Sequence, residues 1–425
     1  HDAAMLRRNV LFILVLVALL ALPACGSGET GSGGGGETRT VLVDYNHDEM
    51  ASAFLAYFPR SVSVHPGDTV VFKQAWTGEP HSVTMGTLTD GLMREVMPLI
   101  EKYPEVESAE QLKAVDPAAF DVYNRVCLAD GTIEPSPESL CPALPDMATF
   151  GGPDVLKMNQ NGAQPCYLDE GAPPTDKEKA CPKREQPDFN GRQSFYNSGY
   201  IHYEGDEGNT FKMTLSEDIK PGNYQYYCNL HSPFAMSGAI EVKPKTASVP
   251  SQAAVDRQAR KEIDKQAAPL LKAFNDAKAG KATLQGKPFK GNLAGYGIDN
   301  PEAEIPAFIS EFIPNPIKAK VGEKVTWRVE GHTVSFDVPR YFPIATVGKD
   351  GKVTFNPRAV KAIDSPVAEP PDGPPPEDGP SPPTDVDAGA WDGRSFISSG
   401  VPDGPINWSL TFTKAGKYKY ACLIH

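Results

Sequence analysis

Two short stretches of this chain carry a cysteine and a histidine separated by two residues. In YCNLHSPFAM (227 to 236) they are Cys228 and His231, and Met236 follows with a Cys-x2-His-x4-Met spacing. A thiolate, an imidazole and a thioether on one loop can converge on one ion. A further imidazole from a neighbouring strand would complete two histidines and a cysteine with a weak axial methionine, the donor set of electron-transfer copper sites. The strand histidine that fits is His81, in GEPHSVTM.

The second stretch, KYKYACLIH (417 to 425), repeats the cysteine and the histidine as Cys422 and His425, and the sequence given stops there. The segment EGHTVSF supplies His332 in the place that His81 has in the first stretch. We therefore expect a second site of the same kind. We also expect the natural chain to continue with a methionine or another axial ligand, at the spacing seen in the first stretch, and then with a closing strand.

Both stretches belong to an internal repeat that divides the chain into two halves. In each half, short runs of alternating apolar residues are separated by turns rich in glycine and proline, which predicts an antiparallel β-sandwich. The totals of 38 glycines and 41 prolines agree with a loop-rich β protein. The matching segments are 62–85 with 317–336, 191–199 with 392–400, and 211–231 with 408–425.

Each half resembles the cupredoxins, in their plastocyanin-like branch. The residues that carry the resemblance are the strand histidine of PHSV and the Cys-x2-His-x4-Met loop after the tyrosine-rich strand YQYYC. The resemblance covers most of both halves and neither of their insertions. It implies an all-β fold of two tandem Greek-key β-sandwich domains, with one type 1 copper in each. The ligands that it implies are His81, Cys228 and His231 with axial Met236 in the first half, and His332, Cys422 and His425 in the second.

One feature departs from the family pattern. Ser82 and Thr333 follow the strand histidines, where many plastocyanins have asparagine. This departure leaves the reduction potential open, and not the identity of the metal. Four other interpretations of the ligand residues stay open: a disulfide between Cys228 and Cys422, a structural zinc ion, Met236 as a core residue only, and an empty second site.

Composition sets the boundaries of the expected parts. Apolar residues from Val255 to Phe274 keep near-helical spacing, and Gly280 is a natural stop, which predicts a helix between the halves. The segment 365–383 is dominated by proline, acids and glycine and cannot bury a core, so we expect a mobile loop. The expected parts are a signal peptide with a lipobox at 1–25, a flexible tether at 26–38, cupredoxin domain 1 at 39–246 with an insertion at about 88–190, a helical linker at 247–285, and an incomplete cupredoxin domain 2 at 286–425 with a proline-rich loop at about 364–390.

The insertion in the first half holds a cluster of cysteines, and it opens with the helical pattern GLMREVMPLIEKY. We expect two disulfides that stabilise a small subdomain, because an exported chain can keep them. Four cysteines allow three connectivities, and the sequence does not choose among them. The cysteines are Cys127, Cys141, Cys166 and Cys181.

The N-terminal segment has the layout of a secretory signal: arginines, an apolar run from Val10 to Leu22, and a small-residue site. The run is short for a membrane-spanning helix, which needs about 20 residues. The sequence LPAC (22 to 25) resembles the bacterial lipobox. It implies that Cys25 is lipidated and that the chain is a lipoprotein on the extracytoplasmic face of the cell membrane. Ordinary secretion and an uncleaved anchor are the alternatives.

The formal net charge is -13 and the pI is near 5.2. Such a charge argues against nucleic acid as a partner, because phosphate binding needs a basic face. It would suit a basic protein partner, although surface solvation alone also explains it. The leading interpretation is a membrane-tethered electron carrier that serves a cytochrome c, a quinol-oxidising complex or a terminal oxidase.

Two other functions compete with the electron carrier. One is a copper carrier in copper homeostasis. The other is a multicopper oxidase or copper nitrite reductase, since these enzymes also repeat cupredoxin domains. They need further histidines, commonly one directly before the ligand cysteine. Tyr227 and Ala421 hold those places, and the sequence contains no His-x-His pair. We therefore expect that the chain is not an enzyme.

Overall fold

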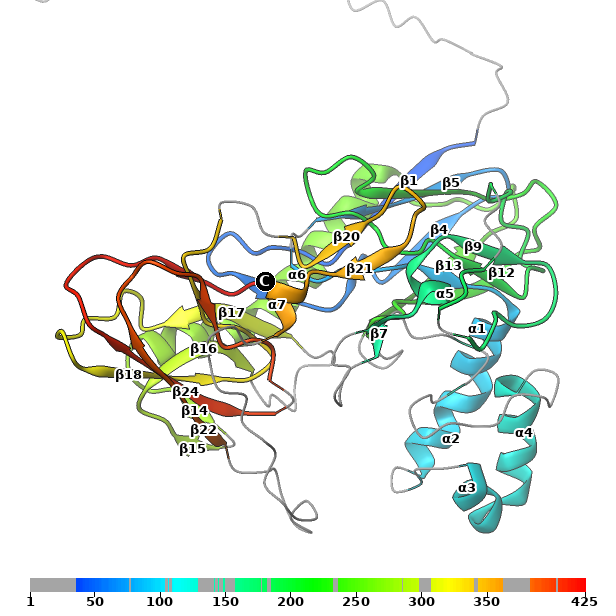
Figure 1. Ribbon diagram of the computed structural model, residues 1–425. Coiled ribbons are helices and arrows are strands. Elements are labelled where there is room, and N and C mark those ends of the chain that lie inside the picture. The colour runs from blue at the N-terminus through cyan, green and yellow to red at the C-terminus, as the bar shows by residue number, and fades with distance from the viewer. Residues whose placement is uncertain are drawn as a thin grey trace, which may run out of the picture. The chain divides into compact units, whose positions relative to one another are not determined.

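Strands outnumber helices in the described chain (Figure 1). The signal peptide with Cys25, the tether up to residue 35 and most of the proline-rich loop lie outside the described residues. Within the part of the chain that is described, no helix is long and apolar enough to cross a lipid bilayer. The computed structural model describes residues 36–425 apart from 76–77, 104–105, 107–108, 129–140, 142–143, 145–147, 150–156, 177, 182–184, 232–235, 285, 298–306, 340–342, 362–382 and 403.

The first half forms two β-sheets around one core. Their side chains alternate between buried and more exposed, as in strands with one face against a core. Val41 and Phe72 of one sheet and Tyr226 and Ile240 of the other belong to the same apolar cluster. One sheet has the order β11 (Thr210–Thr214), β5 (Thr69–Gln74), β1 (Thr38–Val43), β3 (Tyr57–Phe58). The other has the order β4 (Ser61–Val64), β13 (Ser237–Val242), β12 (Gly222–Tyr227), β6 (Thr84–Met85), β10 (Phe195–Asn197), β9 (Cys166–Leu168).

The second half also has two main sheets around a core, which is built on Trp327, Phe336 and Trp408. The larger sheet has the order β2 (Ser52–Ala53), β17 (Phe308–Ile313), β16 (Asn292–Gly297), β18 (Lys324–Val329), β24 (Ile406–Phe412), β22 (Thr384–Trp391). The smaller has the order β23 (Ile397–Ser398), β19 (Ser335–Phe336), β25 (Tyr420–Ala421). The expectation of a mostly β fold is confirmed, and its Greek-key detail stays a prediction.

Equivalent strands of the two halves pair in the same way. Strands β1 and β5 run parallel, with Val43 beside Gln74. Strands β16 and β18 also run parallel, with Ala294 beside Val329. The strand after the site histidine then pairs with the strand before the site cysteine in both halves, β6 with β12 and β19 with β25. These registers let each residue near one site be matched with its counterpart near the other.

The two halves are joined through a shared core and a shared sheet. The helix predicted between them is present as α6 (Gln252–Lys278), and Gly280 follows it with a φ of 72°. Ile263 of α6 belongs to one apolar cluster with Phe58 of the first half and Ile309 of the second. Strand β2, which lies between β1 and β3 of the first half in sequence, pairs with β17 of the second half. Residues 36–425 thus form one compact unit, while the domain boundaries at 246 and 286 stay a prediction.

The insertion in the first half is helical at its start, as predicted. It also contains two disulfides, and each joins neighbours in sequence: Cys127 with Cys141, and Cys166 with Cys181. Figure 1 shows α2, α3 and α4 packed together beside the sheets. The elements are α1 (Thr87–Gly91), a π-helical turn η1 (Leu92–Val96), α2 (Met97–Lys102), α3 (Ala109–Val115), α4 (Pro117–Cys127), β7 (Ala148–Thr149), β8 (Lys157–Met158) and α5 (Gln160–Ala163).

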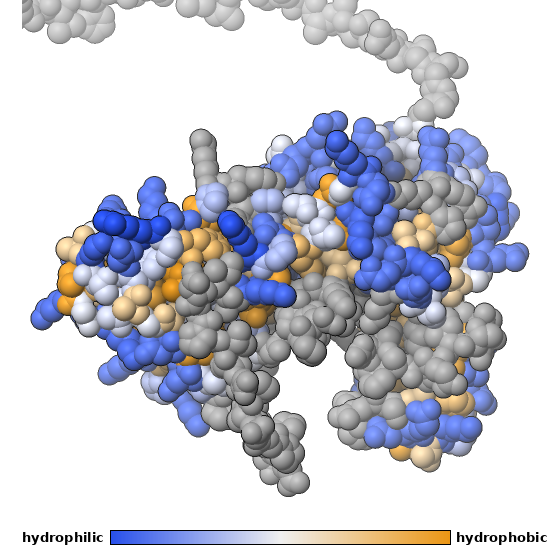
Figure 2. All heavy atoms as spheres, viewed as in Figure 1, coloured by the Kyte–Doolittle hydropathy of each residue, from blue (hydrophilic) through white to orange (hydrophobic). Residues whose placement is uncertain are grey.

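The proline-rich loop ends earlier than the expected residue 390. Strand β22 begins at Thr384 and pairs with β24 in parallel, because Val386 and Trp391 are apolar residues that the second core buries. The remaining short elements of the second half are β14 (Thr283–Leu284), β15 (Lys287–Pro288), β20 (Ala345–Val347), β21 (Val353–Phe355) and α7 (Pro357–Val360). Hydrophilic side chains cover much of the described face in Figure 2.

Candidate metal centres

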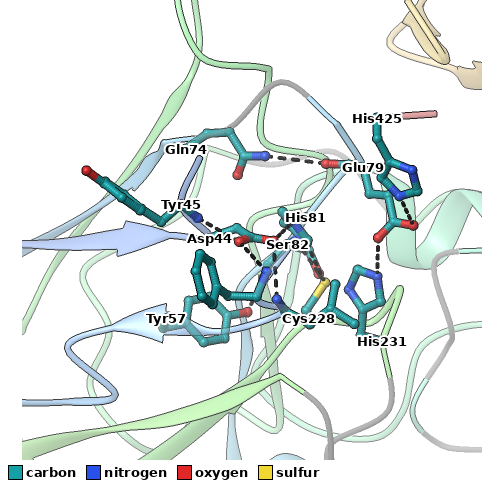
Figure 3. Close-up of polar contacts among 12 residues, drawn as sticks. Asp44, Tyr45, Tyr57, Gln74, Glu79, His81, Ser82, Cys228, His231 and His425 are labelled. Carbon is teal, nitrogen blue, oxygen red and sulfur yellow. Dashed lines mark hydrogen bonds and ion pairs between the residues drawn. The ribbon is translucent and has the colours of Figure 1, made fainter. Parts of the chain in front are cut away.

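The structure brings the three predicted ligands of the first half together. His81 lies just before β6, and Cys228 and His231 follow β12. Figure 3 shows the three side chains close together. Nδ1 of His81 lies 3.8 Å from Sγ of Cys228. One nitrogen from each histidine and the cysteine sulfur all lie within 4.8 Å of one another. His81 and Cys228 are fully buried, and the His231 side chain is 12% exposed. This first site is a compact group of one sulfur and two imidazoles.

One ring nitrogen in the first site suits a metal particularly well. Nδ1 of His231 is buried and has no hydrogen-bond partner among the described residues. The other ring nitrogen, Nε2, donates to Oε2 of Glu79 at 2.8 Å. A carboxylate that holds one N–H of a histidine leaves the opposite nitrogen as a lone-pair donor, the arrangement usual for metal-ligating histidines. The residues of the first site therefore fit a bound metal ion.

Met236 lies beside the same cysteine. Its side chain is fully buried in the apolar cluster that includes Cys228. Its carbonyl oxygen accepts a hydrogen bond of 3.1 Å from the backbone N–H of Cys228. The loop thus closes on itself between these two residues. The role of Met236 as an axial ligand stays a prediction.

The second site repeats the first with residues of the second half. His332 lies just before β19, and Cys422 and His425 follow β25. Sγ of Cys422 lies 3.8 Å from Nδ1 of His332 and 3.7 Å from Nδ1 of His425. The two Nδ1 atoms are 2.8 Å apart. Three potential ligand atoms thus converge, and their residues are those that the repeat predicted.

The surroundings of both cysteines favour the thiolate, the form that binds metals. Burial raises the pKa of the Cys228 thiol, but the imidazoles of His231 and His81 outweigh burial and hold that pKa well below its usual range. The pKa of Cys422 is likewise held low, because its two neighbouring histidines outweigh the effect of burial.

Backbone hydrogen bonds fix the sulfur atoms. The N–H of Ser82 lies 3.4 Å from Sγ of Cys228, and the N–H of Thr333 lies 3.3 Å from Sγ of Cys422. The N–H of Ile424 also reaches Sγ of Cys422, at 3.4 Å. The residues directly after the strand histidines therefore hold the thiolates through their main chain. Such a main-chain bond does not depend on the side chain at that position, which is serine in the first half and threonine in the second.

Asp44, which was not among the predicted site residues, lies against the outer nitrogen of the His81 ring. Its fully buried Oδ2 is 3.3 Å from Nε2 of His81. The carboxylate also accepts backbone N–H groups, including that of Phe54 at 2.9 Å. The strand register makes Gly295 its counterpart in the second half. A Cβ atom on Gly295 would lie 2.0 Å from Nε2 of His332, so no side chain fits there. The sequence signal that could have pointed to Asp44 is that the repeat aligns this aspartate with a glycine, Gly295, in the second half.

Glu79 was also missed, although it lies two residues before His81. Its carboxylate accepts from Nε2 of His231 and, at 3.2 Å, from Nε2 of His425 of the second site (Figure 3). Burial alone would raise the pKa of Glu79, but the hydrogen bonds to the two histidines outweigh burial and keep that pKa well below its usual range. The counterpart in the repeat, Glu330, is 64% exposed and pairs with Arg328 instead.

Comparison with known proteins gives only distant matches. Neither a protein-family model nor a curated protein matches the chain. Among solved structures, reduced auracyanin from the photosynthetic bacterium Roseiflexus castenholzii is 16% identical, with 50% of this chain and 100% of that chain covered and a TM-score of 0.21. Auracyanin A, a "blue" copper protein from Chloroflexus aurantiacus, is 11% identical, with 48% of this chain and 98% of that chain covered and a TM-score of 0.19. A multicopper oxidase is 9% identical, with 91% of this chain and 78% of that chain covered and a TM-score of 0.18. Similarity this low leaves the function to be argued from the two His/Cys/His groups.

Proposed function

We propose that the chain is a copper protein that carries one electron at each of its two His/Cys/His groups. The observation that carries the proposal is a cysteine sulfur with two imidazoles around it, found once in the described part of each half. In both groups the strand histidine presents Nδ1 at 3.8 Å from the sulfur. Thiolate and imidazole ligands suit copper and zinc and not the hard cations, and a nearby buried methionine favours copper.

The chain's own residues hold the ligands in place. Bound copper would supply a reversible one-electron change between Cu(II) and Cu(I). A site whose ligands move little between the two states loses little energy to reorganisation. Here the strand histidine and the cysteine stand at the ends of paired strands, and Asp44 and Glu79 contact the outer nitrogens of His81 and His231. We propose Met236 as the weak axial ligand that tunes the first site.

The choice of a carrier over an oxidase rests on the residues before the ligand cysteines. An oxidase of the repeated-cupredoxin kind would use a histidine there. Tyr227 instead pairs with Thr84 in the sheet and is buried in an apolar cluster, and Ala421 has the same place in the second half. Copper-loaded protein with ascorbate should therefore consume neither oxygen nor nitrite catalytically. Sustained turnover of either would favour the enzyme.

We further propose that the carrier is tethered outside the cytoplasmic membrane and serves a redox protein. The lipobox-like LPAC and the glycine-rich segment after it support a lipid anchor on Cys25. The net charge of -13 suits a basic partner, such as a cytochrome c. Cys25→Ala should move the protein from the membrane fraction to the soluble fraction without changing its copper absorption. Retention of this variant in the membrane would contradict the anchor.

Copper loading tests the central proposal. The full chain should bind one copper ion per His/Cys/His group. It should show an intense visible band from thiolate-to-copper charge transfer and a narrow hyperfine splitting in the Cu(II) EPR spectrum. Cys228→Ser and Cys422→Ser should each remove the band of one site, and the double variant should be colourless. A double variant that keeps the band would show that these cysteines are not the ligands.

A further inference from the structure

We propose that the two metal sites exchange electrons within one chain, from the first site to the second, across the carboxylate of Glu79. This inference rests on the proposed function, since both groups must hold copper. It goes beyond that function because it makes the protein a two-site relay with a direction, and not a pair of independent carriers.

The bridge consists of one side chain that touches a ligand of each site. Nε2 of His231 lies 2.8 Å from Oε2 of Glu79, and Nε2 of His425 lies 3.2 Å from Oε1 (Figure 3). The path from site to site is therefore imidazole, hydrogen bond, carboxylate, hydrogen bond, imidazole. Electrons tunnel more readily through such a short bonded path than across a gap. The side chains of His231 and His425 are only 12% and 5% exposed, so little of either ring faces the solvent.

The two halves are fixed to each other beside this bridge. Leu423 and Ile424, which lie between the ligands Cys422 and His425, pack in one apolar cluster with Tyr200 of the first half. Leu230, next to His231, packs against the same cluster. A second link is polar and buried: the Gln160 side chain donates to the Val353 carbonyl at 2.9 Å and accepts from its N–H at 3.1 Å. The bridge geometry thus needs no movement of one half against the other.

The direction follows from charges that differ between the sites. The buried carboxylate of Asp44 lies 3.3 Å from the outer nitrogen of His81, and a nearby anion stabilises Cu(II) over Cu(I). Gly295 takes its place at His332, and His332 forms no ion pair with any described residue. The second copper should therefore be the more easily reduced one.

Hydrogen bonds to sulfur act in the same direction. Sγ of Cys422 receives two backbone N–H groups, from Thr333 and Ile424. Among the described residues, the donors to Sγ of Cys228 are the N–H of Ser82 and, at a long 3.9 Å, the hydroxyl of the same residue. Donors to sulfur withdraw electron density from the thiolate and raise the reduction potential. Both differences favour the electron on the second site.

The step is balanced by the two metals alone. With copper held by the two His/Cys/His groups, one electron would pass from Cu(I) in the first group to Cu(II) in the second, so that one ion is oxidised as the other is reduced. No covalent bond forms or breaks, and no proton moves. A one-electron donor protein reduces the first site before the step, and a one-electron acceptor protein reoxidises the second site after it.

A kinetic experiment on the full chain tests the bridge. Protein loaded with Cu(II) ions receives less than one electron per chain by pulse radiolysis, and the visible bands of both sites are followed. Cys228→Ser and Cys422→Ser provide the spectrum of each site alone. Equilibration should be independent of protein concentration. Glu79→Gln should slow it at least tenfold, because the amide replaces one of the two carboxylate oxygens with an NH2 group, which cannot accept from a histidine N–H. A rate proportional to concentration, or an unchanged rate in Glu79→Gln, would overturn the inference.

A matched control and a second variant keep the result interpretable. Glu330→Gln alters the same position of the repeat, where the side chain is exposed, and should leave the rate unchanged. If Glu79→Gln loses copper, Glu79→Asp keeps the charge on a shorter side chain and should still slow the exchange. An undiminished rate in copper-replete Glu79→Asp would then count against the bridge.

Equilibrium potentials test the direction and separate the two hypotheses. Redox titration of Cys422→Ser reports the first site, and that of Cys228→Ser reports the second. We expect the second site to favour the electron at least tenfold, which corresponds to about 59 mV for one electron. Equal or reversed potentials would overturn the direction. A chain with no charge-transfer band at either site would refute the proposed function, whereas two bands without internal exchange would refute this inference alone.

Discussion

Replacement of Asp44 by asparagine should raise the reduction potential of the first site by about 100 mV. The side chain is fully buried against His81. Asparagine has almost the same shape and keeps an oxygen that can accept the N–H of Phe54, which Asp44 accepts at 2.9 Å. It removes the negative charge, and with it the electrostatic preference of the site for Cu(II).

The magnitude follows from Coulomb's law. Oδ2 of Asp44 lies 3.3 Å from Nε2 of His81. The width of the imidazole ring and a metal–nitrogen bond of about 2 Å place the charge about 7 Å from a bound ion. At an effective dielectric constant of about 20, one unit charge at that distance contributes about 2 kcal/mol. For a one-electron couple this energy corresponds to about 100 mV.

The assay is a redox titration followed by the visible band, in a Cys422→Ser background that leaves only the first site. Asp68→Asn is a matched control, since Asp68 is also a buried carboxylate but lies at the opposite end of β5. Asp68 lies about 20 Å along the strand from Asp44 and so is farther from the first site. Removing its charge should shift the reduction potential of that site by about a third as much as Asp44→Asn, or less. An Asp44→Asn variant with an intact band and an unchanged or lowered potential would refute the reasoning.

Three further changes have defined outcomes. Gly295→Ala places a Cβ atom 2.0 Å from Nε2 of His332 and strains a residue with a φ of 77°. Copper titration of this variant should therefore show loss of the second site only, and full occupancy of both sites would contradict this. Burial raises the pKa of Asp90, so the folded state loses stability as the pH rises from the unfolded pKa through the folded one. Asp90→Asn, which can still accept the backbone N–H that Asp90 binds at 2.8 Å, should melt higher than the wild type at pH 7, with the gap closing near pH 4; a constant gap would exclude the charge as its cause. Ile263→Ala in α6 should lower the free energy of unfolding, measured by urea titration, by about 3 kcal/mol. Lys261→Ala on the exposed face of α6 should change it by less than about 0.5 kcal/mol, and similar losses in the two variants would mean that the helix does not hold the shared core.

The ligand groups could be predicted because most of their geometry is local. Cys228 and His231 lie on one loop, so their spacing alone brings the sulfur and the imidazole to the same place. His81 could be added because its strand pairs with the strand before that loop. The internal repeat then transferred the pattern to Cys422 and His425. The helix between the halves was equally readable, since its apolar residues keep a helical period over its length.

The joining of the halves could not be predicted. Strand β2 has two residues, Ser52 and Ala53, and so short a segment carries no periodicity. Its partner β17 is found only when the two halves are packed together. The same limit applies to β22, because it follows directly on a proline-rich stretch and the expected loop, to about residue 390, covers nearly all of it. Disulfide pairing stayed open for a similar reason, because four clustered cysteines are compatible with several arrangements.

By itself, the sequence determined which histidines and cysteines form the two His/Cys/His groups, which strands stand next to them, and where the central helix lies. Only the tertiary structure decided that Asp44 lies beneath His81 while its counterpart is Gly295, and that Glu79 meets His425, which lies 346 residues away. The physical reason is that spacing and periodicity govern neighbours along the chain. Contacts between remote segments depend on how whole sheets pack, and that packing is what makes two similar sites unequal and connects them.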